Sequence, residues 1–137
     1  MRYRFLAIGL GLLAGIVMIV IMESVSGVMY PMPESVNPGD LEAVNTYLKN
    51  EAPMEGYIMI LLGYLLGAFA GGFTACWFEK LETQRMNSAL ITGAILMAFG
   101  LMNLFMIYHP TWFWAASLAV YLLAAWLGGK LALGIKK

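Results

Sequence analysis

Four long apolar segments constrain this chain more than any other feature of its sequence. They cover approximately residues 5–22, 57–78, 88–108 and 112–133. Each is close to the roughly 20 residues that an α-helix needs to cross the hydrocarbon core of a bilayer. Lipid offers no partners to backbone amides and carbonyls, so segments that cross it must be helical. The pattern predicts an all-α polytopic membrane protein, in which residues 1–137 form a single four-helix membrane domain.

The composition limits where a function can reside. Hydrophobic residues make up 61% of the chain and charged residues 12%, whereas soluble domains carry about 25% charged residues. The spans take up most of the chain and leave no room for a soluble catalytic domain, so any function must lie in the bundle or in its one long loop. No stretch combines basic and aromatic residues as nucleic-acid-binding surfaces do. We therefore expect membrane lipids, and no nucleic acid, among the partners.

The basic residues predict the orientation in the membrane. Seven of the eight lie on the side of both termini and of the turn "EKLETQR", and only Lys49 lies opposite. Because cytoplasmic loops carry an excess of lysine and arginine, both the N and the C terminus are expected in the cytoplasm. Most acidic residues lie on the other side, which predicts an acidic outer face. Short loops and basic cytoplasmic ends favour the bacterial inner (plasma) membrane.

A phrase of twelve residues occurs twice. "YLLGAFAGGFTA" covers residues 64–75 and "YLLAAWLGGKLA" covers residues 121–132, and seven aligned positions are identical. Both copies run in the same direction across the membrane. A true duplication predicts two similar hairpins related by an axis along the membrane normal, a parallel repeat. Apolar helices also resemble one another through composition alone, and that interpretation stays open.

Small residues recur every four positions in both copies, a pattern known as a glycine zipper. Such a pattern gives a helix a flat groove that lets another helix approach closely. Either the grooves pack the four helices of one bundle together, or one groove faces another subunit. The predicted helix-packing residues are Gly63, Gly67, Gly71, Gly72, Ala75, Ala124, Gly128, Gly129 and Ala132.

Polar residues at the outer ends of the spans are the candidate functional residues. Glu23 ends the first span, Asn103 lies near the outer end of the third, and Tyr30 and His109 follow them at similar positions. Polar groups in a membrane are costly and frequently functional, so these four residues predict a polar cluster at the outer mouth. A carboxylate partly removed from water and a nearby imidazole suit proton exchange or cation binding. In the alternative interpretation, each residue is simply satisfied by its own surroundings.

The sequence predicts no catalytic, metal or cofactor site. One histidine and one glutamate are fewer than the three protein ligands of a usual catalytic zinc. The hydroxyls Ser24, Ser26 and Thr111 occur in no motif that would place a base beside them. The single cysteine, Cys76, excludes an internal disulfide. These features favour a protein that is not an enzyme.

The outer loop, residues 23–56, is the one substantial region outside the spans. Residues 38–50 predict a short amphipathic helix, with Asn37 as N-cap, Pro38 in the first helical position and Lys49 near the end. Such a helix would lie across the bundle mouth as a lid, or it would dock a partner.

Three passages carry a resemblance: Glu23 followed by "YPMP", then "GYLLGAFAGG", then "NLFMIYHPTWFW" from Asn103 to Trp114. Through them the chain resembles uncharacterised small bacterial inner-membrane proteins of four helices. The resemblance implies the same topology and adds no mechanism.

Two function classes follow from these observations. In the first, the chain is an accessory or scaffold protein that associates with another membrane protein through its grooves and outer loop. In the second, it is a small transporter or channel for protons, cations or small solutes, which acts as a homo-oligomer with the polar cluster at its outer mouth. Coupled transport generally uses a titratable group deep in a span. The sequence has none, which favours the first class.

Overall fold

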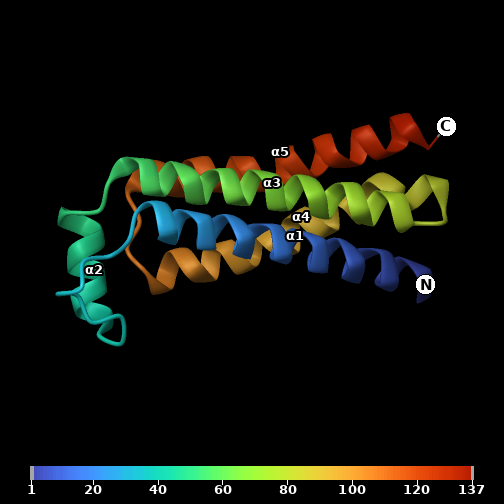
Figure 1. Cartoon of the computed structure of the whole chain (residues 1–137). Coiled ribbons are helices and arrows are strands. Elements are labelled where there is room, and N and C mark those ends of the chain that lie inside the picture. Colours follow the sequence, from blue (N-terminus) through green and yellow to red (C-terminus); the bar gives the residue numbers. More distant parts are fainter. Residues whose placement is uncertain (1, 137) are drawn as a thin grey trace.

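The computed structural model describes residues 2–136, and every regular element within them is helical. Four long helices lie side by side, and a short helix lies across one end (Figure 1). The elements are α1 (Arg2–Met29), α2 (Leu41–Asn50), α3 (Met54–Phe78), the 3₁₀ turn η1 (Glu82–Gln84), α4 (Arg85–Met106) and α5 (Thr111–Ile135). The N and C termini lie together at the end opposite α2 (Figure 1). We call the two ends of the bundle the α2 end and the terminal end.

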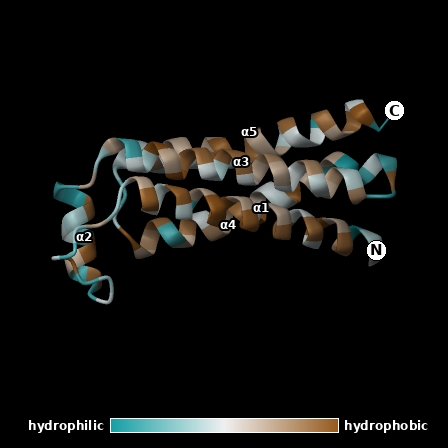
Figure 2. Cartoon of the chain, in the orientation of Figure 1, coloured by the Kyte–Doolittle hydropathy of each residue, from teal (hydrophilic) through white to brown (hydrophobic). Residues whose placement is uncertain are grey.

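The four long helices are long and apolar enough to cross a membrane, which makes the chain a multi-pass membrane protein. Figure 2 shows apolar residues along all four helices and hydrophilic residues at α2 and at the turn between α3 and α4. From Arg4 to Glu23, α1 rises about 28 Å at 1.5 Å per residue, close to the roughly 30 Å of hydrocarbon in a bilayer. Glu23 therefore lies near one edge of the hydrocarbon layer.

Helix α1 is longer than the sequence predicts. It continues to Met29, so Glu23 lies inside a helix and not at the start of a loop. The segment between α1 and α3 covers residues 30–53 rather than 23–56. The polar residues after Glu23 do not end the helix, and the hydroxyl of Ser24 donates to the carbonyl of Val20 one turn earlier (2.8 Å).

Helix α2 begins later than the sequence predicts. It covers Leu41–Asn50, and its N-cap is Asp40, whose carboxylate accepts hydrogen bonds from the amides two and three residues ahead (3.0 and 3.2 Å). The prediction of Asn37 as N-cap and Pro38 as first helical residue was wrong. The side chain of Asn37 closes the preceding turn instead (2.9 Å to the amide two residues on), because Asp40 offers the same kind of acceptor next to the apolar part of the helix.

Helix α2 is held across the bundle by side-chain hydrogen bonds. The hydroxyl of Tyr57 donates to the carbonyl of Leu48 (2.7 Å), and the side-chain oxygen of Asn45 accepts from the backbone amide of Tyr108 (2.8 Å). Among the described residues, no Cα of α2 lies within 8 Å of a Cα in another helix. Helix α2 is therefore a lid that stands off the bundle and covers space beneath it.

Replacing Asn45 with alanine is expected to loosen this lid. The Tyr108 amide loses its acceptor, which removes about 1 kcal/mol from the closed arrangement. Hydrogen exchange in detergent should show α2 amides exchanging several-fold faster. Asn50→Ala is the matched control, because this side chain of α2 makes no hydrogen bond within the described residues. Equal exchange in the two variants would show that the Asn45 bond does not hold α2 in place.

The small-residue groove of α3 is filled by α1. A Cβ placed on Gly67 would lie 2.8 Å from the carbonyl oxygen of Gly15, and one on Gly71 would lie 3.0 Å from that of Gly11. At these distances there is room for the hydrogen of a glycine but not for a side chain. Gly63 and Ala75 face α1 in the same way. This groove is thus occupied within the chain and is not open to another subunit.

The small residues of α5 are also used inside the bundle. A Cβ on Gly128 would overlap the backbone of α3, at 2.9 Å from the amide nitrogen of Phe73, and one on Gly72 would lie 2.7 Å from the Cα of Ala125. The remaining members of the set are buried as well: Ala124, Gly129 and Ala132. The glycines therefore permit backbone contact between α3 and α5.

The two copies of the repeat lie side by side as α3 and α5 (Figure 1), but their surroundings differ. A two-fold axis between them would place aligned residues on the same interface. Gly72 faces α5, whereas its aligned residue Gly129 faces α4. The same axis would exchange the pair α3–α4 with the pair α5–α1. Helix α3 packs on α4, whereas no described Cα of α5 lies within 8 Å of a Cα in α1. The duplication therefore stays a prediction from the sequence.

Candidate functional site

A cleft of about 320 Å³ enters the bundle between α1 and α4. Val20 and Phe99 in its walls are 52% and 51% exposed. Because both are on membrane-spanning helices, the cleft opens on the surface that faces lipid. Its polar groups come one from each long helix: Glu23, Tyr64, Asn103 and Tyr121. The other walls are apolar: Ile16, Ile19, Leu96 and Gly100.

Two stacked tyrosines form the inner wall of this cleft. The rings of Tyr64 and Tyr121 lie 5.1 Å apart at 27°, and each residue is 2% exposed. Asn103 donates its side-chain amide to the Tyr64 hydroxyl (3.0 Å), which leaves the side-chain oxygen of Asn103 as an acceptor. A Cβ on Gly100 would lie 2.7 Å from the Tyr121 ring, so a glycine is needed here for the stack to form.

A second cavity, of about 310 Å³, lies beneath the lid. Its lining comes from the four helices α1, α2, α3 and α4, from Met32 in the segment after α1, and from the turn between α4 and α5. Glu23 and Asn103 line both this cavity and the cleft. The two spaces therefore meet at these two side chains, and one opens toward lipid while the other lies under α2.

Glu23 has no ionic partner in the described part of the chain. Its side chain is exposed, and the one ion pair within residues 2–136 joins Arg85 to Glu82 (3.5 Å) at the terminal end. Neither the cleft nor the cavity has a lysine or an arginine in its lining. A carboxylate at the edge of hydrocarbon is costly without a partner, which makes Glu23 a candidate ligand-binding residue.

His109 is a buried, neutral part of the cavity lining. It is 8% exposed, stacks on Phe113 (4.9 Å, 25°) and has its edge toward Tyr57 (6.1 Å). Its Nδ1 lies 2.8 Å from the carbonyl oxygen of Ile107. A carbonyl can only accept, so Nδ1 carries the hydrogen. Burial lowers the pKa of His109 below its usual 6.5, and the Ile107 carbonyl opposes this in part. The ring is therefore mainly uncharged at neutral pH.

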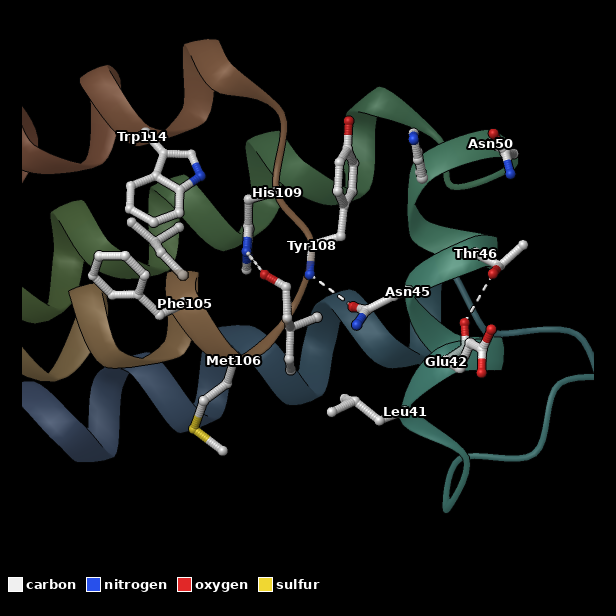
Figure 3. Close-up of a pocket in the computed structure, with 13 residues that line it drawn as sticks. Leu41, Glu42, Asn45, Thr46, Asn50, Phe105, Met106, Tyr108, His109 and Trp114 are labelled. Carbon is white, nitrogen blue, oxygen red and sulfur yellow. Dashed lines mark hydrogen bonds between the residues drawn. The ribbon is translucent and has the colours of Figure 1, made fainter.

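An open groove of about 860 Å³ flanks the cavity, between α2 and the turn before α5 (Figure 3). One side is polar, where the hydroxyl of Thr46 donates to the carbonyl of Glu42 (2.9 Å). The other side is aromatic, where Phe105 and Trp114 pack edge to face at 4.9 Å. Figure 3 also shows the bond from the Tyr108 amide that joins the two sides.

The predicted polar cluster is brought together in part. Glu23, Asn103 and His109 line one cavity. Tyr30 lies apart, beside a smaller cavity, with its ring near Gly56 at the start of α3. Sequence reasoning did not include the two stacked tyrosines among the candidates. The available signal was that both copies of the repeat begin with a tyrosine, which places a hydroxyl inside an apolar span.

A buried carboxylate at the terminal end was also missed. Glu79 is 1% exposed, and it accepts hydrogen bonds from the hydroxyl of Ser88 (2.9 Å) and the amide of Leu81 (3.1 Å). Burial raises its pKa, but these bonds, the Lys80 amide and the charge of Arg4 together outweigh burial and hold the pKa below its usual value. The ionised carboxylate therefore ties the end of α3 to α4. A glutamate followed nine residues later by a serine gives no recognisable sequence pattern.

The cleft combines four polar side chains with apolar walls. Within residues 2–136, no three histidine, cysteine, aspartate or glutamate side chains lie close enough together to hold a metal ion. The polar groups of the cleft are a carboxylate, a carboxamide and two hydroxyls beside apolar walls, which suit a molecule with a polar head and an apolar body. No known protein family, curated protein or solved structure matches the chain.

Proposed function

We propose that the protein binds a small amphiphilic molecule where its two cavities meet. The observation that carries this proposal is that Glu23 and Asn103 line both the cleft and the cavity beneath α2. A molecule held there would have its apolar body in the cleft and its polar head at these two side chains. Each space lies at the lower end of the roughly 300–1,000 Å³ typical of ligand sites.

The packing favours a site that exchanges its ligand at one side of the membrane over a channel that crosses the membrane. Toward the terminal end, the helices close by backbone contact at Gly71, Gly72 and Gly128. The cleft lies on the α2 side of these contacts and opens laterally. A ligand would enter from the hydrocarbon between α1 and α4 and leave beneath the lid. We place α2 outside and both termini in the cytoplasm of a bacterial inner membrane, which the basic residues near the terminal end support.

A second proposed function is that of an accessory or scaffold protein. The open groove beside α2 favours it, because aromatic and polar side chains both line it (Figure 3). The small-residue grooves no longer support this function or a homo-oligomer, since helices of the same chain fill them. Docking of another membrane protein would then occur at the α2 end.

Filling the mouth of the cleft is expected to remove the bound molecule. Val17 and Val20 lie on the same helix and are 49% and 52% exposed, but only Val20 lines the cleft. In native mass spectrometry of protein gently extracted from its own membrane, we expect a small-molecule adduct in the wild type. Val20→Trp should lower the bound fraction at least tenfold, and Val17→Trp should leave it unchanged.

Equal adduct levels in the two tryptophan variants would rule out the cleft as the binding site. A wild-type protein without any adduct would also count against the proposed function. A stoichiometric complex with a different protein, in place of a small molecule, would favour the accessory function.

A further inference from the structure

We propose that the ligand of this site is a lipophilic amine, a molecule with an ammonium head on an alkyl body. This inference rests on the proposed function and names the chemical class of its ligand. Its basis is the match between the hydrogen-bonding groups of the site and those of an ammonium. An ammonium has three donors and no acceptor.

The polar groups at the meeting point of the two spaces offer acceptors and carry no positive charge. The carboxylate of Glu23 can only accept when ionised. Asn103 donates one amide hydrogen to Tyr64, and its side-chain oxygen stays available as an acceptor. No lysine or arginine lines either space, and the uncharged ring of His109 adds no positive charge. A phosphate or carboxylate head would find no cation here, whereas an ammonium would find an unpaired carboxylate.

The electrostatic surroundings favour a cation as well. Low-dielectric walls focus the field of one sign of charge in a cleft. Five acidic residues lie between α1 and the first turn of α3, against the single basic residue Lys49: Glu34, Asp40, Glu42, Glu51 and Glu55. This excess attracts an ammonium toward the α2 end and repels an anionic head group.

An aromatic ring near the meeting point adds a third contribution. Tyr108 lines the cavity beneath the lid and is half-buried, whereas the rings of Tyr64 and Tyr121 are stacked on each other. An aromatic ring attracts an ammonium through its electron-rich face, by about 0.5–2 kcal/mol. From Glu23 to Ile16 the cleft wall runs for about 10 Å along α1, and it is apolar beyond the carboxylate. This wall suits an alkyl chain that points into the membrane.

The test compares three twelve-carbon probes on the purified protein in the neutral detergent dodecyl maltoside: dodecylamine, dodecanol and dodecanoate. Dodecylamine is protonated at pH 7 and should raise the thermal unfolding midpoint in a saturable manner, because a ligand that binds the folded state stabilises it. Dodecanol and dodecanoate should not. Glu23→Gln should weaken the apparent affinity for dodecylamine at least tenfold. Glu34→Gln removes the same charge from the α2 end at an exposed residue that lines neither space, and it should weaken the affinity far less than Glu23→Gln.

The outcomes separate this inference from the proposed function. If dodecanol or dodecanoate stabilises the protein as well as dodecylamine, and Val20→Trp abolishes that effect, the cleft binds amphiphiles but the amine class is wrong. If Glu23→Gln and Glu34→Gln behave alike, the assignment of Glu23 as the ammonium partner is also wrong. If no probe binds and the native protein carries no adduct, both proposals fail.

A second arm identifies the source of the ligand. Phosphatidylethanolamine carries an ammonium at the tip of a zwitterionic head group on a bilayer lipid. If it displaces dodecylamine from the wild type, the ligand is a membrane lipid. If it does not, while dodecylamine still binds, the ligand is a single-chain amine. Either result supports an ammonium ligand, and displacement by phosphatidylglycerol, which lacks an amine, would overturn it.

Discussion

Gly128→Ala is expected to destabilise the bundle by about 1–3 kcal/mol, the usual cost of overpacking a closely packed interior. The result would be opposite to the normal effect of this substitution, because alanine favours a helix over glycine by up to about 1 kcal/mol. The reason is the contact between α5 and α3. A Cβ on Gly128 would overlap the carbonyl oxygen of Phe69 and lie 2.9 Å from the amide nitrogen of Phe73. Both are backbone atoms of a helix, so neither can rotate away, and the two helices must separate.

The matched control for this prediction is Gly134→Ala on the same helix. No heavy atom lies within 4 Å of a Cβ placed on Gly134, so this variant should be neutral or slightly more stable. The free energy of unfolding of each variant in detergent is the quantity to measure. Equal stabilities for the two variants would show that α3 and α5 are not in backbone contact.

Glu79→Gln is expected to lower stability at neutral pH by about 1.5–3 kcal/mol, the range for hydrogen bonds to a charged group. Glu79 is 1% exposed and accepts from the hydroxyl of Ser88 and the amide of Leu81. A glutamine keeps one acceptor oxygen, but its second group is an NH₂ that donates. This group would face either the Ser88 hydroxyl or the Leu81 amide, so one of the two hydrogen bonds would be lost. The end of α3 would then lose one of its links to α4.

The same variant predicts a change in the pH dependence of stability. The pKa of Glu79 is lower in the folded protein than its ordinary 4.5. Its contribution is therefore fully present above the unfolded pKa and is lost as the pH falls through the lower, folded value. The wild type should lose stability below about pH 4.5, and Glu79→Gln should lose less over that range.

Unfolding free energies at pH 7 and at about pH 3.5 would check this second prediction. Glu82→Gln is the control, because the Glu82 side chain is 83% exposed and pairs only with Arg85. An exposed ion pair contributes about 0–1 kcal/mol, so this variant should follow the wild-type curve. If Glu79→Gln also follows that curve, the carboxylate does not stabilise the terminal end.

The four spans could be predicted from the sequence because the hydropathy of each residue measures how favourably that residue transfers from water into lipid. The end of α1 could not be predicted in this way. The residues after Glu23 are less apolar, yet the helix continues to Met29 because its backbone hydrogen bonds do not require apolar side chains. Helix α2 was located correctly in outline, and its first turn was misplaced because Asn37 and Asp40 are both good capping residues.

The candidate site was predictable only where a polar residue interrupts an apolar run. Glu23 and Asn103 stood out for that reason. The stack of Tyr64 on Tyr121 depends on α3 and α5 being neighbours, and a single sequence does not contain that information. The spacing of the glycines similarly indicated which helix faces are flat. It did not indicate that α1 fills the groove of α3.

The fit of α1 into α3 has a consequence for how the protein is made. The groove residue Gly67 is synthesised about 50 residues after Gly15, which at roughly 5–20 residues per second is a delay of several seconds. During that time α1 must remain in the bilayer without its partner. Its span has the highest mean hydropathy of the four, and that of α5 has the lowest. The order of the spans along the chain therefore suits insertion: the helix that waits longest is the one that lipid alone holds best, and the last helix arrives when its neighbours are already in place.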